Sequence, residues 1–363
     1  MPVLAYATSI SPFLNNSILD EAIASRFPGA SIWPVAKRAA IARGWEFSTA
    51  DIVLDRIRSG ELQARDVRVI QEEDAALGSA LVGAGARASL LLCGESPLFA
   101  RDFYRRLSEY SRGFDHALLF RGALSRIAPA TQGHVLHFPG FHRDRNTNVQ
   151  SWEARAQVVL VAGNKYWRHE GVPILQRIQR GLQTLRDRSH RDWLKGHQLH
   201  DRRLELLVGL YDAGLLTVFG QGWDVSHHLP VYWREKLSRA KVEGRPLGPT
   251  EKQHTVSGFR FALTMENFQY PGYVTEKIID ALAAGSIPLY LGAPDIGDFI
   301  PSDAFIDLRN FSSPDDLVAY LSAMDEHTGM AMINRGQEFL RSRAGDDFTF
   351  ERQGECIVDI AVA

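Results

Sequence analysis

Residues 261–291 read FALTMENFQYPGYVTEKIIDALAAGSIPLYL and carry the most informative pattern in the chain. An apolar run ends at Met265 and is followed by two polar residues, Glu266 and Asn267. Thr275 is a favourable N-cap for a helix, and Gly285 can end that helix before a second apolar run begins. The pattern predicts a strand, a helix and a second strand, which is the repeating unit of a parallel sheet.

The start of this helix is suited to binding an anion. A helix N-terminus presents N–H groups and the positive end of the helix dipole, both of which favour a diphosphate. Lys277 adds a full positive charge, and Glu276 can accept two hydrogen bonds from a ribose diol. The alternative is that Glu276 and Lys277 are merely solvated charges of a first helical turn.

Short apolar runs alternate with helical patterns along most of the chain. Strands are expected at residues 3–10, 88–93, 117–121, 158–162, 215–220, 261–265 and 286–291, and helical spacing occurs at 51–57 and 99–110. This alternation indicates an α/β fold with parallel sheets covered on both faces, in which ligands bind at the carboxyl ends of strands. Because the polar stretch 142–153 separates two such series, we expect domains at 1–150 and 151–345 and a tail at 346–363.

Composition limits the possible classes of protein. The chain has 363 residues, of which 45% are hydrophobic and 23% charged, as in globular proteins of two domains. A net charge of -2 argues against nucleic acid as a partner. Cys93 and Cys356 form no disulfide framework and are predicted to be buried thiols in a reducing compartment. With no pattern typical of a signal peptide or a membrane span, a cytoplasmic location is expected.

The 261–294 stretch resembles the donor motif of the family 10 glycosyltransferases, the α1,3/4-fucosyltransferases, in their soluble bacterial form. The matching features are Glu266-Asn267, the run Tyr-Val-Thr-Glu-Lys at 273–277, the alanine-rich helix, Gly-Ser-Ile-Pro and Leu-Gly-Ala-Pro. Residues 304–321 are similar to the segment that follows in that family. The resemblance implies a GT-B fold, in which two Rossmann-like domains have parallel sheets that face across a cleft. It also implies an inverting mechanism, GDP-fucose as donor, a glycan or glycolipid acceptor, and no obligatory metal or cofactor.

The resemblance also implies roles for particular residues. Residues 158–165 are similar to the strand and turn that open the family's donor domain, and 201–204 to its arginine-bearing helix. Arg203 would bind phosphate, with Arg202 the alternative by register; Arg203 could instead be one more surface charge. The donor-binding residues implied are Asn164, Lys165, Arg203, Glu266, Asn267, Tyr273, Thr275, Glu276 and Lys277.

Glu95 is the candidate catalytic residue. It ends an apolar run in Cys-Gly-Glu-Ser-Pro at 93–97, which looks like the family's turn bearing the general base. Inverting transfer needs one carboxylate that takes the proton of the acceptor hydroxyl. Glu95 could instead cap the following helix, in which case the base would be Asp115 or Glu266.

Three further features are less decisive. Residues 168–203 carry nine basic and four acidic residues, which is compatible with contact to a membrane surface or an anionic acceptor, or, as we favour, with a solvated basic helix. Met265 and Phe268, on either side of Glu266-Asn267, depart from the family's motif. His197, His200 and the pair at 227–228 lack zinc-site spacing, so no metal is expected.

Two other functions stay open from the sequence. A GT-B transferase that uses another sugar nucleotide would carry a similar helix with glutamate near its start. A catalytically silent carbohydrate-binding protein or scaffold is the alternative from a different class, and Lys277, Arg203 and Glu95 argue against it.

Overall fold

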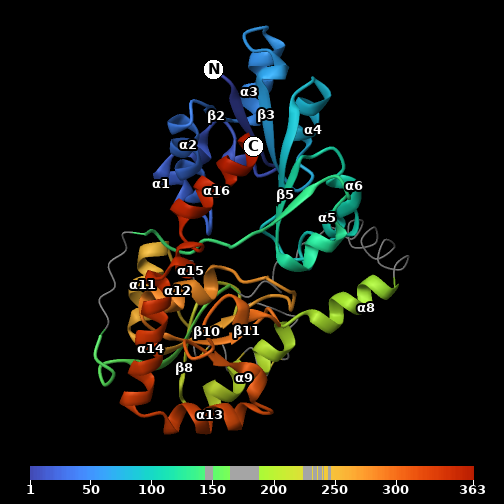
Figure 1. The fold of residues 1–363 in the computed structure, drawn as a ribbon. Coiled ribbons are helices and arrows are strands. Elements are labelled where there is room, and N and C mark those ends of the chain that lie inside the picture. The colour runs from blue at the N-terminus through green and yellow to red at the C-terminus, as the bar shows by residue number, and fades with distance from the viewer. Residues whose placement is uncertain are drawn as a thin grey trace. The chain divides into compact units, whose positions relative to one another are not determined.

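The computed structural model describes residues 1–143, 150–163, 188–223, 231, 235, 239, 241–243 and 247–363. The chain divides into two compact units. Unit 1 comprises Met1–Arg145, Tyr270–Ile279 and Ser342–Ala363; unit 2 comprises Asn146–Gln269 and Asp280–Arg341. Helices surround a parallel sheet in each unit (Figure 1).

Unit 1 contains a sheet with the strand order β2-β1-β3-β4-β5-β6, and every pairing in it is parallel. Its strands are β1 (Val3–Ala7), β2 (Glu46–Thr49), β3 (Val67–Glu72), β4 (Arg87–Leu92), β5 (His116–Leu119) and β6 (Gln132–Val135). Its helices are α1 (Glu21–Ala24), α2 (Ile32–Ala42), α3 (Ala50–Arg58), α4 (Ala76–Gly83), α5 (Arg101–Arg105), α6 (Leu107–Tyr110), α15 (Arg343–Asp346) and α16 (Phe350–Val362). The sequence VLAYA makes β1 a wholly buried central strand.

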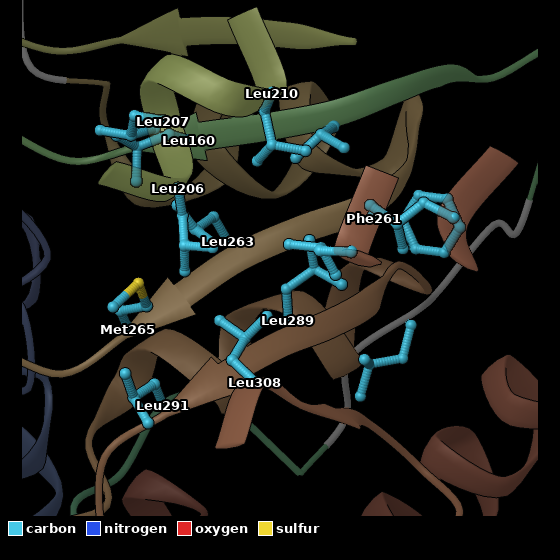
Figure 2. Packing of buried hydrophobic residues seen from close by; sticks show 14 of the residues in the cluster. Leu160, Leu206, Leu207, Leu210, Phe261, Leu263, Met265, Leu289, Leu291 and Leu308 are labelled. Atoms are coloured by element: carbon cyan, nitrogen blue, oxygen red, sulfur yellow. The ribbon is translucent and has the colours of Figure 1, made fainter. Parts of the chain in front are cut away.

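Unit 2 contains the second parallel sheet, with the order β12-β11-β10-β7-β8-β9. Its strands are β7 (Ala156–Val161), β8 (Leu216–Phe219), β9 (Lys241–Glu243), β10 (Phe259–Met265), β11 (Ile287–Leu291) and β12 (Ile306–Asp307). Its helices are α8 (Arg188–His197), α9 (His200–Asp212), α11 (Pro249–Ser257), α13 (Pro314–Ala323) and α14 (Glu326–Arg341); α12 (Glu276–Ala284) begins in unit 1 and ends in unit 2. Leucines of α9 pack with apolar side chains of β10 and β11 (Figure 2).

The strand, helix and strand predicted from residues 261–291 are confirmed. β10 ends at Met265, α12 begins at Glu276, directly after Thr275, and β11 follows. Gly285 has φ +71°, and its N–H donates to Leu282 O, while the N–H of Ser286 donates to Ala281 O. These two bonds form a Schellman motif, for which glycine is the favoured residue because it has no Cβ.

The strands that the sequence predicts are all present with slightly different bounds, but others escape the prediction. β2, β3, β6, β9 and β12 were not expected; β3, for instance, reads VRVIQE and mixes charged with apolar residues. The helical spacing at 99–110 corresponds to two short helices, α5 and α6, because Arg106 leaves the helical region with φ -104° and ψ 16°.

Residues 346–363 differ from the expected tail. Within unit 1 they include α16, the red helix beside the blue α2 in Figure 1. A Cβ on Gly354 would lie 2.7 Å from Val35 Cγ1 and 3.0 Å from Ala36 N, so the bare glycine lets α16 and α2 approach closely. Ile357, Val358 and Ile360 of α16 are buried, so their apolar side chains contribute to the core of unit 1.

Candidate functional site

Glu266 and Asn267 follow the carboxyl end of β10, as predicted. Glu266 is fully buried and Asn267 is 4% exposed. The N–H of Glu266 donates to Leu291 O over 2.8 Å, which extends the pairing of β10 with β11 by one residue. A Cβ on Gly292 would lie 2.5 Å from Glu266 Cγ, so glycine at this position leaves room for the glutamate side chain.

Arg203 reaches this strand end from α9. Its Nη2 donates to Met265 O at 2.8 Å and to Glu266 O at 2.9 Å, and lies 3.4 Å from Asn267 Oδ1. Arg203 is 5% exposed, so its interpretation as a surface charge is wrong. The structure brings Arg203, Glu266 and Asn267 together, with the guanidinium holding the backbone that carries the other two.

Arg202, the alternative by register, points elsewhere. It pairs with Glu205 at 2.6 Å and donates to Phe311 O at 3.0 Å. Arg203 is therefore the arginine of this helix that meets the end of β10.

Met265 and Phe268 contribute to packing in unit 2. Met265 belongs to the core cluster of this unit, and Phe268 is fully buried. The rings of Trp193 and His197 lie 5.1 Å and 5.8 Å from that of Phe268, and His197 O accepts from the N–H of Gln269 at 2.7 Å. These bonds and rings tie the end of α8 to the loop that follows β10.

The loop that leads into α12 packs within unit 1. The N–H of Gly122 donates to Pro271 O at 2.9 Å, and the Tyr273 ring meets the Phe120 ring edge to face at 4.9 Å. Gly272 has φ +72°, and a Cβ there would lie 2.8 Å from Arg121 N. Tyr273 is 2% exposed, so its ring helps to hold this loop against the residues that follow β5.

Lys277 and its neighbours occupy the first turn of α12. Lys277 Nζ donates to Thr275 Oγ1 at 2.8 Å and lies 3.6 Å from Glu276 Oε1. The side chains of Glu276 and Lys277 are 19% and 23% exposed, so they are not the solvated charges of the alternative interpretation. Within this unit the structure brings together Tyr273, Thr275, Glu276 and Lys277.

Glu95 lies exposed in the turn after β4, also in unit 1. Its carbonyl oxygen accepts a hydrogen bond from Tyr104 Oη at 2.9 Å and lies 3.6 Å from Cys93 Sγ. The N-cap residue of α5 is Ala100, so Glu95 does not cap the helix that follows. Tyr104 and Cys93 are fully buried and fix the backbone of this turn while its carboxylate stays accessible.

Tyr104 also contacts the 270–279 segment. Its ring meets that of Tyr270 edge to face, with centroids 5.8 Å apart. One buried tyrosine thus contacts both the Glu95 turn and the first residue of the 270–279 segment. Burial raises the pKa of Tyr104 well above its ordinary value, so its O–H remains a donor at neutral pH.

Two carboxylates at the end of β3 were missed by the sequence analysis. Glu72 accepts hydrogen bonds from Tyr6 Oη and Thr8 Oγ1, both at 2.7 Å. Burial, together with the charges of Glu72 and Glu95, raises the pKa of Glu73 to about 7. The sequence feature that could have identified them is the pair of glutamates at 72–73. Because the sequence does not predict β3, it does not show that this pair lies at the end of a strand.

Asp115, an alternative base, lies just before β5, at the amino end of that strand. Its carboxylate pairs with Arg87 at 2.7 Å. Glu95 and Glu73 follow the carboxyl ends of β4 and β3 instead. Asp115 therefore lies where the parallel strands begin, whereas Glu95 and Glu73 lie where they end.

Several predicted features lie partly or wholly outside the described residues. Asn164 and Lys165 lie outside them, as does most of the basic segment 168–203.

No described helix has the length and apolarity that crossing a membrane requires. Across the ranges that the structure describes, no three His, Cys, Asp or Glu side chains are grouped so that they could hold a metal ion. Cys93 is buried as predicted, whereas Cys356 is partly exposed.

Comparison with known proteins places the matching region in unit 2 and the 270–279 segment. Residues 197–332 match the family described as glycosyltransferase family 10 (fucosyltransferase), C-terminal part. This region is similar to the C-terminal part of that family. It covers less than half of the chain, yet it contains Arg203, the Glu266-Asn267 pair and Lys277.

Curated relatives agree with the family 10 match. The chain is 39% identical over 118 residues to an α-(1,3)-fucosyltransferase 7 of Rattus norvegicus, covering 29% of this chain and 32% of the relative. It is 35% identical over 136 residues to a 3-galactosyl-N-acetylglucosaminide 4-α-L-fucosyltransferase of Homo sapiens, covering 34% and 38%. The aligned part thus spans about a third of the length of these relatives.

Solved structures resemble the chain over nearly its whole length. An α1,3-fucosyltransferase has a TM-score of 0.53 and 12% identity, covering 100% of this chain and 90% of that one. The sucrose-phosphate synthase of Thermosynechococcus elongatus has a TM-score of 0.58 and 10% identity, covering 99% and 98%. At such identities the likeness shows the fold, and it confirms the GT-B class with two parallel sheets.

Proposed function

We propose that this chain is an inverting α1,3/4-fucosyltransferase, which transfers L-fucose from GDP-fucose to a hydroxyl group of a glycan acceptor. The observation that carries the proposal is the family 10 match over residues 197–332. The curated relatives described above are fucosyltransferases by name.

The donor residues support this proposal in two groups. In unit 1, Lys277 and the N-terminus of α12 offer positive charge to a diphosphate, as a metal ion would elsewhere. In unit 2, Glu266 and Asn267 are polar groups held at a strand end by Arg203. Asn164 and Lys165 are proposed as donor contacts from the sequence, and Glu276 as the partner of the ribose hydroxyls.

Glu95 is proposed as the general base. Its carboxylate takes the proton of the acceptor hydroxyl while that oxygen attacks the anomeric carbon of fucose. The bond from this carbon to the diphosphate oxygen breaks at the same time, and GDP leaves with the electron pair. Attack opposite the leaving group inverts the configuration at the anomeric carbon.

A nucleotide-binding experiment tests the donor assignment. A ligand that binds only the folded state raises the melting temperature in proportion to the logarithm of its concentration over Kd. We expect GDP to raise the melting temperature with and without EDTA, because Lys277 and a helix N-terminus replace the metal. An equal response to UDP would favour another sugar nucleotide, and loss of the response with EDTA would contradict metal independence.

The acceptor and the location of the protein stay sequence-based proposals. The acceptor would be a glycan or glycolipid, and the cytoplasm of a bacterium is the proposed location. If the basic segment 168–203 docks on an anionic membrane surface, replacing Arg180, Arg186 and Arg188 by glutamine should weaken association with anionic liposomes in low salt. Unchanged association would leave the solvated-helix interpretation.

A further inference from the structure

A second carboxyl group lies beside the candidate base, on the neighbouring strand of the same sheet. β3 and β4 pair in parallel, with Gln71 opposite Leu91 and Glu72 opposite Leu92. The N–H of Glu73 donates to Leu92 O at 2.9 Å, which continues the pairing beyond the end of β3. This register places Glu73 next to Cys93, two residues before Glu95.

The backbone of Glu73 is held in an unfavourable conformation. Among the described non-glycine residues, Asn15, Asn16 and Glu73 have positive φ, and Glu73 has φ +51°. Asparagine tolerates this region well, whereas glutamate does not. Gln71 Nε2 clamps Glu73 O at 2.9 Å, and a Cβ on Gly78 would lie 2.2 Å from Gln71 Oε1, so Gly78 leaves room for the clamp. Strain of this kind persists where the surroundings enforce it, and such sites are often functional.

Cys93 connects Glu73 to the Glu95 turn. Its Sγ lies 3.5 Å from Glu73 Oε1 and 3.6 Å from Glu95 O. A thiol has a single proton, so the two oxygens compete for it. An ionised Glu73 attracts this proton more strongly than a neutral one, and the charge on Glu73 therefore changes how the Glu95 turn is held.

The groups that face Glu73 are acidic or neutral. Glu72 lies on β3 and is hydrogen-bonded to Tyr6 and Thr8, Asp74 follows on the same segment, and Cys93 and Glu95 follow β4. Burial is the largest cause that raises the pKa of Glu73 to about 7, ahead of the charge of Glu72. The group thus changes its charge near neutral pH.

We propose that Glu73 is a positioning residue that acts through Cys93 on the Glu95 turn and tunes the transfer step. This inference depends on the proposed function, in which Glu95 takes the acceptor proton. A negative charge on Glu73 favours uptake of a proton by a neighbouring carboxylate, so transfer should accelerate as Glu73 ionises.

Single-turnover fucose transfer as a function of pH tests the inference on the full chain. The probe is GDP-fucose with a galactosyl-N-acetylglucosaminide, the acceptor type in the names of the relatives. The parent rate should rise through a step near pH 7. Glu73→Gln should lose this step and transfer about tenfold more slowly above it, since small displacements of a catalytic group are costly. Its Kd for GDP, measured by calorimetry, should not change.

Matched variants separate this role from a structural one. Asp74→Asn removes the adjacent exposed carboxylate and should keep the step in the pH profile. Glu73→Gly removes the strain of the positive φ and should keep or raise the melting temperature. This variant should nevertheless transfer fucose as slowly as Glu73→Gln. Cys93→Ser retains a donor and should keep the whole step, whereas Cys93→Ala removes the link to the Glu95 turn and should leave a smaller step, due to the charge of Glu73 alone.

The outcomes distinguish the two proposals. If the parent transfers fucose and Glu73→Gln shows the same pH profile and rate, the role of Glu73 is wrong and the proposed function stands. If the parent binds GDP but Glu73→Gln fails only because its melting temperature falls, and Glu73→Gly transfers normally, the residue is merely structural. A parent chain that neither binds GDP nor transfers fucose overturns both proposals.

Discussion

At the residue scale, the two cationic candidates, Arg203 and Lys277, differ in the groups that they contact. Arg203 donates to the carbonyl groups of Met265 and Glu266 from a buried position. Lys277 sits in the first turn of α12 and contacts the hydroxyl of Thr275. Removing Arg203 therefore disturbs the backbone of the site, whereas removing Lys277 changes mainly its charge.

Replacing each cation by alanine should separate these roles. Arg203→Ala leaves buried carbonyl groups without their donor and should lower the free energy of unfolding by about 1–3 kcal/mol, as well as weakening GDP binding. Lys277→Ala should leave the free energy of unfolding nearly unchanged and weaken GDP binding about tenfold to a hundredfold. Urea unfolding and calorimetry with GDP measure the two effects. If Arg203→Ala unfolds with the same free energy as the parent, Arg203 does not stabilise the backbone at the end of β10.

Glu95→Gln should separate donor binding from chemistry. The change is nearly isosteric, and in our proposal Glu95 touches no phosphate. Kd for GDP should stay the same, while single-turnover transfer should fall by a factor of about 10² to 10⁴, as expected for a general base. Transfer at the parental rate would remove Glu95 from the mechanism.

Glu73 should make stability depend on pH. Its pKa rises from 4.5 to about 7 in the folded chain, so between these values the folded state binds more protons than the unfolded state. The stabilising contribution is complete below the unfolded pKa and is lost as pH rises through about 7. Because glutamine stays neutral, Glu73→Gln should gain stability relative to the parent between about pH 5 and about pH 8, as urea midpoints can measure. A constant difference across this range would contradict the raised pKa.

At the scale of elements, the loop 270–275 requires glycine at position 272. Gly272 combines φ +72° with backbone and side-chain atoms of Arg121 less than 3 Å from where a Cβ would be. Gly60 has the similar φ +80° but nothing within 4 Å of its Cβ position. Alanine would strain the backbone at both positions, but it would collide with neighbouring atoms only at Gly272.

Gly272→Ala should therefore cost more than Gly60→Ala. Gly60→Ala should lower the free energy of unfolding by about 1 kcal/mol, through the left-handed backbone alone. Gly272→Ala should lower it by a further ~1–3 kcal/mol because of overpacking, and should weaken GDP binding through the shifted loop. Denaturant unfolding and calorimetry on both variants provide the comparison. Equal costs would show that the Arg121 contact adapts easily.

At the scale of the whole molecule, each compact unit combines segments that lie far apart in the sequence. Unit 1 contains the first strands, the 270–279 segment and the last helix, so three distant parts of the sequence share one unit. The helices α2 and α16, from opposite ends of the sequence, pack together through Gly354, and Arg43 pairs with Asp359 at 2.6 Å. The end of the chain therefore contributes to the stability of unit 1.

Gly354→Val should disturb this packing. The new side chain would collide with Val35 and should lower the free energy of unfolding by about 1–3 kcal/mol. Arg352→Val places the same β-branched residue on the exposed face of α16 and serves as the control. Thermal unfolding, with proteolysis of unit 1 segments as its readout, measures the loss of stability. A parental melting temperature for Gly354→Val would show that α16 contributes little to this unit.

The sequence by itself determined what depends on neighbouring residues. The strand that ends at Met265, the helix start after Thr275 and the stop at Gly285 follow from apolar patterning, capping and the freedom of glycine, all of which act within a few residues. These local patterns alone therefore locate the polar residues at 266–267 and 273–277 at a strand end and a helix start, and the resemblance added the donor class and Glu95.

Only the tertiary structure decided what depends on residues far apart in the chain. The burial of Arg203 against the end of β10, the grouping of 270–279 with the first strands and the packing of α16 on α2 each join distant segments. Glu73 was not identified from the sequence because its raised pKa depends first on burial, and because Cys93 and Glu95 approach it only through the pairing of β3 with β4. Long-range contacts and the desolvation that they cause leave no periodic trace in the sequence, whereas helix caps and strand ends do.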